Sequence, residues 1–259
     1  MGLLDGKHGL IIGVANERSI AWHIAHNASK EGATCAFSYY PDEKMERRVR
    51  RALQSAGLDD AWLHPCDVGS DEDLDRLFVA LTGVMPRVDF VVHSVAYADR
   101  EYLQPGRFVE TPRDVFVRAL DVSAYTLIAV AERAAPLMSD GGAILALTYY
   151  GAEKAIPGYN VMGVAKAALE ATTRYLAADL GERGIRVNAL SAGPCRTVSA
   201  MAVGDVDEMF TRMEQRAPMR RNITTDEVGR SAIYLLSDLS SGVTGETHHV
   251  DAGFNAVAG

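Results

Sequence analysis

The stretch Gly9-Leu-Ile-Ile-Gly-Val-Ala-Asn-Glu-Arg-Ser19 opens the pattern that decides the fold, and the pattern continues through residues 33–39. Residues 9–14 form a short apolar run typical of a buried strand. A helical pattern begins near Ser19 and ends at Gly32, a residue suited to the position just after a helix. Residues 33–39 are a second strand-like run. Strand, helix and strand in this order predict two parallel strands joined by a crossover helix.

The same alternation repeats to the end of the chain. Apolar strands separated by helices indicate a parallel sheet that is buried on both faces. We therefore predict one α/β domain over residues 1–259, a doubly wound Rossmann-like parallel sheet of about seven strands with helices on both faces. Further strands are predicted over residues 61–66, 88–94, 143–149, 185–190 and 247–250, and further helices over 42–56, from Ser70, from Thr111-Pro112 to about 138, and over 159–183 and 225–237.

Two stretches interrupt this rhythm, residues 96–110 and 192–222. Both follow strand ends, and ligands of such sheets bind at the carboxyl ends of the strands. We expect these stretches to form walls of a ligand site, with 192–222 as a substrate-binding loop and helix region.

The composition restricts the class of protein. The 259 residues are 48% hydrophobic and 23% charged, which excludes a disordered chain. A formal net charge of -8 argues against binding to nucleic acid or to a membrane surface. The three cysteines form no Cys-x-x-Cys pair, which is typical of reduced, buried thiols. With no signal peptide and no apolar stretch near the ~18 residues of a membrane span, we expect a cytoplasmic protein.

The first strand–helix turn reads Gly13-Val-Ala-Asn-Glu-Arg-Ser19-Ile20. A small residue allows the backbone to approach a pyrophosphate, and a helix N-terminus supplies N–H donors. Ser19 could donate its hydroxyl to a ligand or cap the helix. Because only one glycine of a Gly-x-Gly-x-x-Gly motif is present, the turn alone fits an ordinary strand–helix connection equally well.

Three later strand ends carry related signals. Asp67-Val68 could bind an adenine edge, although Asp67 could equally cap the following helix. Small residues follow in Ser94-Val95-Ala96, and Thr197 ends a turn after Gly193-Pro194, where its hydroxyl could bind a carboxamide or a phosphate. Four such features at matched strand ends favour a dinucleotide site.

The strongest catalytic signal is Tyr159 followed by Lys166, with Tyr149 ten residues earlier. At about 100° per residue, positions seven apart lie within ~20° on one helix face. An ammonium beside a phenol lowers the phenol pKa and makes it a better acid. The alternative is an interface tyrosine with a solvated lysine. A lone lysine on a nearly apolar helix needs a polar partner, which favours the catalytic interpretation.

The strand–helix turn, the strand ends and the Tyr149–Lys166 stretch described above resemble those of bacterial NADH-dependent enoyl-acyl-carrier-protein reductases of the short-chain dehydrogenase/reductase superfamily. The resemblance covers essentially the whole chain. The Tyr-x6-Lys spacing distinguishes this branch from the commoner Tyr-x3-Lys enzymes. The residues that carry it lie in 13–22, 93–94, 147–170, 187–197 and 245–254.

The resemblance implies reduction of the C2–C3 double bond of trans-2-enoyl thioesters on acyl carrier protein by hydride from NADH, during fatty acid elongation. It implies that Tyr159 hydrogen-bonds the enolate oxygen, Lys166 holds the nicotinamide ribose, and Tyr149 lines the acyl pocket and assists proton delivery. It also implies a homotetramer and no metal. The implied cofactor contacts are Gly13, Ser19, Ile20, Asp67, Val68, Val95, Lys166, Cys195, Arg196 and Thr197, and the implied substrate contacts are Ala98, Tyr149, Tyr159 and Met162.

The chain departs from the family pattern at three places. Ala96 replaces a glycine common in the family, so we expect weaker binding of flat phenolic inhibitors such as triclosan. Tyr40-Pro41 offers no acidic residue to bind a free ribose 2′-hydroxyl, and basic residues follow, so NADPH is not excluded. The segment 205–210 is acidic, as is the carrier protein, so docking would use other residues. The candidates are Arg212, Arg216, Arg220 and Arg221, although a solvated charge run is the commoner origin of such a pattern.

Two other functions remain as alternatives, a carbonyl or alcohol oxidoreductase of the wider superfamily and a non-catalytic dinucleotide-sensing module. The histidines indicate no metal site. His248 and His249 are neighbours on a strand and point to opposite faces, and His93 is predicted to be a packed core residue.

Overall fold

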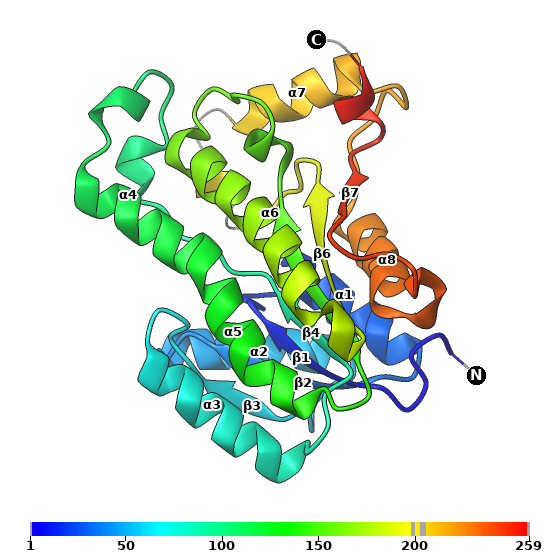
Figure 1. The fold of residues 1–259 in the computed structure, drawn as a ribbon. Coiled ribbons are helices and arrows are strands. Elements are labelled where there is room, and N and C mark those ends of the chain that lie inside the picture. Colours follow the sequence, from blue (N-terminus) through cyan, green and yellow to red (C-terminus); the bar gives the residue numbers. More distant parts are fainter. Residues whose placement is uncertain (1, 198–199, 203–205, 258–259) are drawn as a thin grey trace.

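The computed structural model describes residues 2–197, 200–202 and 206–257 and contains one seven-stranded sheet (Figure 1). All neighbouring strands are parallel, in the order β3-β2-β1-β4-β5-β6-β7. The predicted doubly wound sheet is confirmed, and its order reverses between β1 and β4. The strands are β1 (His8–Ile12), β2 (Thr34–Tyr39), β3 (Leu63–Pro65), β4 (Phe90–His93), β5 (Gly142–Thr148), β6 (Ile185–Ala192) and β7 (Thr247–Val250).

Helices cover both faces of the sheet and bury an apolar layer on each (Figure 1). The layer on one face includes side chains of α1, α2 and α8, and the layer on the other includes side chains of α3, α5 and α6. The helices are α1 (Ile20–Lys30), α2 (Glu43–Ser55), α3 (Asp71–Val84), α4 (Arg113–Leu120), α5 (Thr126–Ala134), α6 (Asn160–Leu180), α7 (Val206–Arg216) and α8 (Thr225–Leu236). None of the described helices is long and apolar enough to cross a membrane.

Several helix ends follow the sequence signals. Gly32 follows α1 with φ +93°, a left-handed conformation that favours glycine. Asp42 accepts backbone N–H bonds at the start of α2, and Ser70 does the same for α3. These predicted boundaries are confirmed.

The predicted long helix from Thr111-Pro112 to about residue 138 is present as one continuous helical run that contains a π-helical segment, but the interpretation of Thr111 as its cap is wrong. Thr111 donates its hydroxyl to the Phe108 carbonyl, and Pro112 is the capping position of α4. A π-helical segment, Asp121–Tyr125, then separates α4 from α5. Within it, the Ser123 hydroxyl accepts the Tyr97 N–H at 3.0 Å, so the widened turn attaches the 96–110 loop to the helix.

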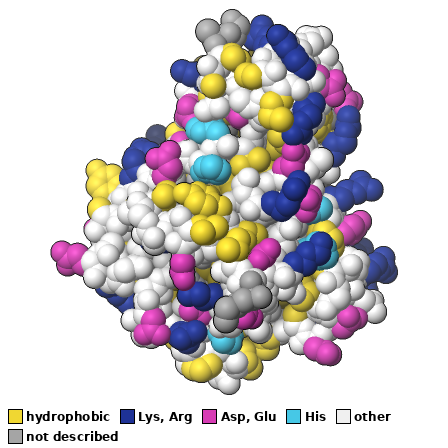
Figure 2. Space-filling model, turned by 90° about the vertical axis from the view of Figure 1, so that its right-hand side faces the viewer, with side chains coloured by type: hydrophobic (Ala, Val, Ile, Leu, Met, Phe, Trp, Pro, Cys, Tyr) yellow, Lys and Arg dark blue, Asp and Glu magenta, His cyan; other side chains and the backbone are white. Residues whose placement is uncertain are grey.

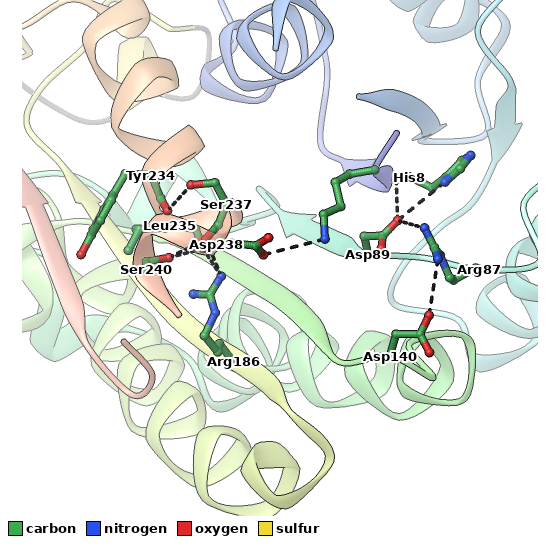
Figure 3. Close-up of polar contacts among 11 residues, drawn as sticks. His8, Arg87, Asp89, Asp140, Arg186, Tyr234, Leu235, Ser237, Asp238 and Ser240 are labelled. Atoms are coloured by element: carbon green, nitrogen blue, oxygen red, sulfur yellow. Dashed lines mark hydrogen bonds and ion pairs between the residues drawn. The ribbon is translucent and has the colours of Figure 1, made fainter. Parts of the chain in front are cut away.

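The amino ends of the strands carry a network of polar contacts (Figure 3). Asp89 accepts the His8 backbone N–H at 2.8 Å and pairs with Arg87 at 3.4 Å. Arg186 on β6 donates to the carbonyls of Leu235 at 2.9 Å and Ser237 at 3.1 Å, which lie at the end of α8. This network joins strands to helix ends on the side of the sheet away from the predicted site.

Candidate active site

A cavity of about 640 Å³ lies at the carboxyl ends of the central strands. Its size is typical of a small-molecule site. It is lined by the first strand–helix turn, the residues after β4, the end of β5, the start of α6 and the loop after β6. The predicted site residues that it brings together are Gly13, Ser19, Ile20, Val95, Ala98, Tyr149, Tyr159, Met162, Lys166, Cys195 and Thr197.

The turn after β1 is built to approach the end of β4 closely. Gly13 has φ +108°, and a Cβ there would collide with the Ser94 carbonyl. Ser19 does not cap α1 with its side chain. Its Oγ instead accepts the backbone N–H groups of Ala15 and Asn16, both at 3.0 Å, and so shapes the turn. The N-terminus of α1 is therefore presented at the cavity without a capping side chain, which fits a dinucleotide phosphate.

Three predicted cofactor residues do not line this cavity: Asp67, Val68 and Arg196. The Asp67 carboxylate accepts the Gly69 N–H at 3.0 Å. Because Ser70 caps α3, the interpretation of Asp67 as the helix cap is wrong. The Arg196 guanidinium lies 4.5 Å from the Phe210 ring centroid and pairs with Asp207 at 3.4 Å.

Tyr149 and Tyr159 form an edge-to-face pair at the cavity, with ring centroids 4.9 Å apart. Tyr159 directly precedes α6 and is only 8% exposed, packed among Leu103, Ala119 and Met162. Burial raises the pKa of Tyr159 well above its ordinary value, with smaller contributions from Tyr149 and Glu170. The predicted lowering of this pKa by Lys166 is therefore wrong, because desolvation dominates. The phenol is a neutral hydrogen-bond donor at physiological pH.

Lys166 is 6% exposed and lies two turns beyond Tyr159 on α6. Its Nζ donates to the Leu147 carbonyl at 2.7 Å, which attaches α6 to the end of β5. Burial lowers the pKa of Lys166 to about 8, and the nearby Glu170 carboxylate opposes this shift. An ammonium has three donors, so this bond leaves two for a ligand in the cavity.

The sequence reasoning missed Glu170 and Thr148. Glu170 is 7% exposed and accepts the Thr148 hydroxyl at 2.7 Å. The available signal was an acidic residue four positions after Lys166 on a helix that is otherwise apolar on this side.

His93 is the buried core residue that the sequence predicts, and His248 and His249 contact different groups. His93 is fully buried, and its Nε2 lies 2.8 Å from the Thr126 hydroxyl. Because that hydroxyl donates to the Val122 carbonyl, Nε2 carries the proton. His249 contacts Glu153, while His248 packs near Tyr234. In the described part of the chain, no group of three His, Cys, Asp or Glu residues is arranged to hold a metal ion.

Comparisons with known proteins agree with this geometry. Residues 13–255 match the family described as enoyl-(acyl carrier protein) reductase. The chain belongs to this family. The enoyl-[acyl-carrier-protein] reductase [NADH] 1 of Rhizobium meliloti is 52% identical over 99% of this chain and 93% of that protein.

Solved enoyl reductases share the fold closely. The Bacillus cereus enoyl-acyl carrier protein reductase, solved with NADP+ and indole naphthyridinone, is 48% identical with a TM-score of 0.96, and each chain is fully covered. The Anaplasma phagocytophilum enoyl-(acyl-carrier-protein) reductase, solved with NAD, is 46% identical with a TM-score of 0.93, covering 100% of this chain and 95% of that one.

Two of the three places where we expect a departure from the family pattern, Ala96 and the segment 205–210, contribute lining residues to the cavity. Ala96 lines the cavity. The acidic segment 205–210 falls at the start of α7, where Asp205 lies outside the described residues. Of the four arginines considered for docking, Arg212 pairs with Glu208 at 2.7 Å and Arg221 pairs with Glu227 at 2.6 Å.

Proposed function

We propose that the protein reduces the C2–C3 double bond of trans-2-enoyl thioesters carried by acyl carrier protein, with NADH as the hydride donor, in fatty acid elongation. The observation that carries this proposal is one cavity that joins a dinucleotide-type turn to Tyr149, Tyr159 and Lys166. The identity to NADH-dependent enoyl reductases over nearly the whole chain supports it.

Each of these side chains has a distinct part in the proposed reaction. Bound NADH supplies the hydride that is added to C3 of the substrate. Tyr159, whose pKa is raised by burial, keeps its proton and donates a hydrogen bond to the thioester oxygen, where negative charge develops. Lys166 binds the nicotinamide ribose with the donors that the Leu147 carbonyl leaves free. Tyr149 bounds the acyl pocket beside Tyr159 and assists proton delivery.

The remaining predicted contacts divide between cofactor and substrate. Gly13, Ser19 and Ile20 would contact the pyrophosphate side, while Ala98 and Met162 would contact the acyl chain. Further cofactor contacts are proposed at Asp67, Val68, Val95, Cys195, Arg196 and Thr197, with Asp67 and Val68 beyond the end of β3 at the same edge of the sheet.

We propose NADH rather than NADPH as the working cofactor. The R. meliloti relative is named for NADH, while the B. cereus enzyme was solved with NADP+. Tyr40 is 57% exposed at the end of β2, and Lys44, Arg47 and Arg48 follow on α2. The ratio of kcat/KM with NADH to kcat/KM with NADPH tests this proposal. A ratio below one would show that NADPH is the preferred cofactor.

The central test is reduction of a crotonyl thioester, followed by the loss of NADH absorbance. The proposal requires turnover with the unsaturated thioester and none with simple ketones. Turnover only with ketones or alcohols would instead indicate a carbonyl or alcohol oxidoreductase. Cofactor binding without turnover on either substrate would indicate a dinucleotide-sensing module.

We propose that acyl carrier protein docks near the 192–222 region through basic residues that form no ion pair with the described residues. Arg212 and Arg221 are engaged with Glu208 and Glu227, which leaves Arg216 and Arg220 as better candidates. Charge reversal at Arg216 and Arg220 should raise KM for the carrier-bound substrate without affecting a short crotonyl thioester. Equal KM values for both substrates in variant and parent would place docking elsewhere.

We also propose a homotetramer, and two faces offer apolar contact surface. On α4 to α6 and the π segment between them, Val117, Tyr125 and Tyr175 are 58%, 50% and 77% exposed. Figure 2 shows hydrophobic side chains gathered on another face, which carries β7 and α8, where Tyr234 and Leu239 are 37% and 63% exposed. Light scattering coupled to size exclusion should give a mass of four chains, and a monomer would refute the proposal.

A further inference from the structure

The strongest unexplained feature near the cavity is a buried carboxylate on the catalytic helix. Glu170 follows Lys166 by one helical turn, and both side chains are nearly buried, at 7% and 6% exposure. They bind consecutive residues of β5, because Lys166 donates to the Leu147 carbonyl and Glu170 accepts from the Thr148 hydroxyl, both at 2.7 Å. Both side chains are therefore attached to the end of β5 from the same helix, one turn apart.

Lys166 needs a counter-charge that its direct contacts do not supply. Among the described residues, no carboxylate lies within 4.0 Å of its Nζ, and its one protein hydrogen bond goes to a neutral carbonyl. A buried ammonium without a nearby anion loses its proton readily. Glu170 is the carboxylate placed to prevent this, one turn away on the same helix.

We propose that Glu170 is a positioning residue that keeps Lys166 in its charged form and thereby sets the upper pH limit of the enzyme. This inference rests on the proposed function, in which the Lys166 ammonium binds the nicotinamide ribose. Glu170 acts through Lys166 and does not itself line the cavity.

The surroundings of both groups agree with this arrangement. Burial raises the pKa of Glu170, and the Thr148 hydrogen bond opposes that shift. The Lys166 pKa of about 8 is the balance between burial, which lowers it, and Glu170, which raises it. The other titratable or charged groups near the pair are Glu153 before α6, His249 on β7, Arg174 on α6, His93 on β4 and Tyr159.

The sign of the effect follows from these contributions. Removal of the Glu170 charge removes the contribution that raises the Lys166 pKa, so Lys166 deprotonates at a lower pH. The basic limb of the kcat/KM profile should therefore move to lower pH by about one unit in Glu170→Gln. The amide oxygen of Gln still accepts the Thr148 hydroxyl, so this variant removes the charge and keeps the hydrogen bond.

A stability measurement separates this role from a purely structural one. Since burial disfavours the Glu170 carboxylate, its ionised form costs folding stability at neutral pH. In Glu170→Gln the loss of this cost is opposed by the loss of the counter-charge of buried Lys166, so the Tm should stay close to that of the parent. A purely structural role predicts a clearly lower Tm with an unchanged pH profile.

The experiment measures kcat/KM for crotonyl thioester reduction at saturating NADH from pH 6 to pH 10. The affinity for NADH is measured by fluorescence titration over the same pH range. The variants are Glu170→Gln, Glu170→Met and Glu170→Asp, with Glu182→Gln as a matched control, since Glu182 is exposed just beyond the same helix. The acid shift should appear in the Gln and Met variants, which lack the charge, and not in the Asp variant or the control.

The outcomes are distinguishable from a failure of the proposed function. Absence of crotonyl thioester turnover in the parent would refute the proposed function, and the pH dependence of NADH binding would still test Glu170. The inference is overturned if the parent reduces crotonyl thioester and the basic limb of its kcat/KM profile coincides with those of both uncharged variants. If Gln does not fold, Met supplies a second uncharged side chain of similar length, and its pH profile decides.

Discussion

The polar side chains at the amino and carboxyl ends of the strands lie in different environments. At the amino edge, Asp89 and Arg186 are surrounded by partners, with backbone groups of His8, Leu235 and Ser237 satisfying them directly (Figure 3). At the carboxyl edge, Lys166 and Tyr159 are buried with few partners, and burial shifts the pKa of each. Buried groups with shifted pKa values are characteristic of functional sites, whereas hydrogen-bonded networks such as that at the amino edge stabilise the fold. The comparison predicts that mutations at the two edges have different consequences.

The largest effect should come from Tyr159→Phe at the carboxyl edge. Loss of the one donor to the developing oxyanion should reduce kcat by about 10²- to 10³-fold. The Tm should not fall, because the ring keeps its packing against Leu103 and Met162. Steady-state kinetics and thermal melting check both parts. Tyr175→Phe, at a side chain that is 77% exposed, is the control and should leave kcat unchanged.

At the amino edge, Arg186→Met should lower the stability of the protein and not its kcat. Removal of the guanidinium takes the charged donor from the carbonyls of Leu235 and Ser237 and leaves them the neutral donors of Ser240, so the free energy of unfolding should fall by about 2 kcal/mol. The kcat should stay within about twofold of the parent. Urea unfolding measures the first quantity. Arg87→Met, which breaks half-exposed pairs, should cost less than about 1 kcal/mol. A large loss of kcat in Arg186→Met would contradict the inference that residues at the amino edge affect stability and not turnover.

Acid should destabilise the protein partly through His93 on the site side of β4. Burial lowers the pKa of His93 to about 3. The folded protein therefore holds this ring neutral while the unfolded chain protonates it below about 6.5. Stability that is present above pH 6.5 is lost as the pH falls toward 3, by up to about 1.4 kcal/mol per pH unit. In His93→Gln the dependence of Tm on pH should be flatter in this window, and thermal melts of parent and variant from pH 4 to pH 7 check it.

The smallest effect concerns the cavity wall at Ala96. Removing the methyl group in Ala96→Gly should tighten the binding of a flat phenolic inhibitor such as triclosan by about fivefold, since an extra methyl group forced against a packed ligand costs about 1 kcal/mol. Inhibition constants measured on parent and variant check this expectation. Equal constants would show that Ala96 does not limit the inhibitor site.

The sheet, most helix boundaries and the grouping of the site could be predicted from the sequence because they depend on local signals. Apolar runs mark the strands, Asp42 and Ser70 mark helix starts, and Gly32 marks a helix end. Parallel strands then bring their carboxyl ends together, which places the Gly13 turn, Val95 and Thr197 around one cavity without any knowledge of tertiary contacts.

The errors arise where tertiary contacts outweigh local signals. Thr111 has the composition of a cap, but its hydroxyl binds the Phe108 carbonyl. The Tyr159–Lys166 spacing predicts a shared helix face, yet the pKa of the phenol depends on how deeply α6 is covered. Glu170 was overlooked because only its bond to Thr148 on another element reveals that it is buried and engaged.

The π-helical segment Asp121–Tyr125 has a consequence for how this chain tolerates insertions and deletions. A π turn contains one more residue than an α turn, so it offsets the angular phase of α4 from that of α5. Removal of one residue there would restore a continuous α-helix and rotate α4 by about 100° about its axis. Ala119, which packs in the cluster around Tyr159, would then point elsewhere. The number of residues in this short segment is therefore a constraint on the packing over Tyr159.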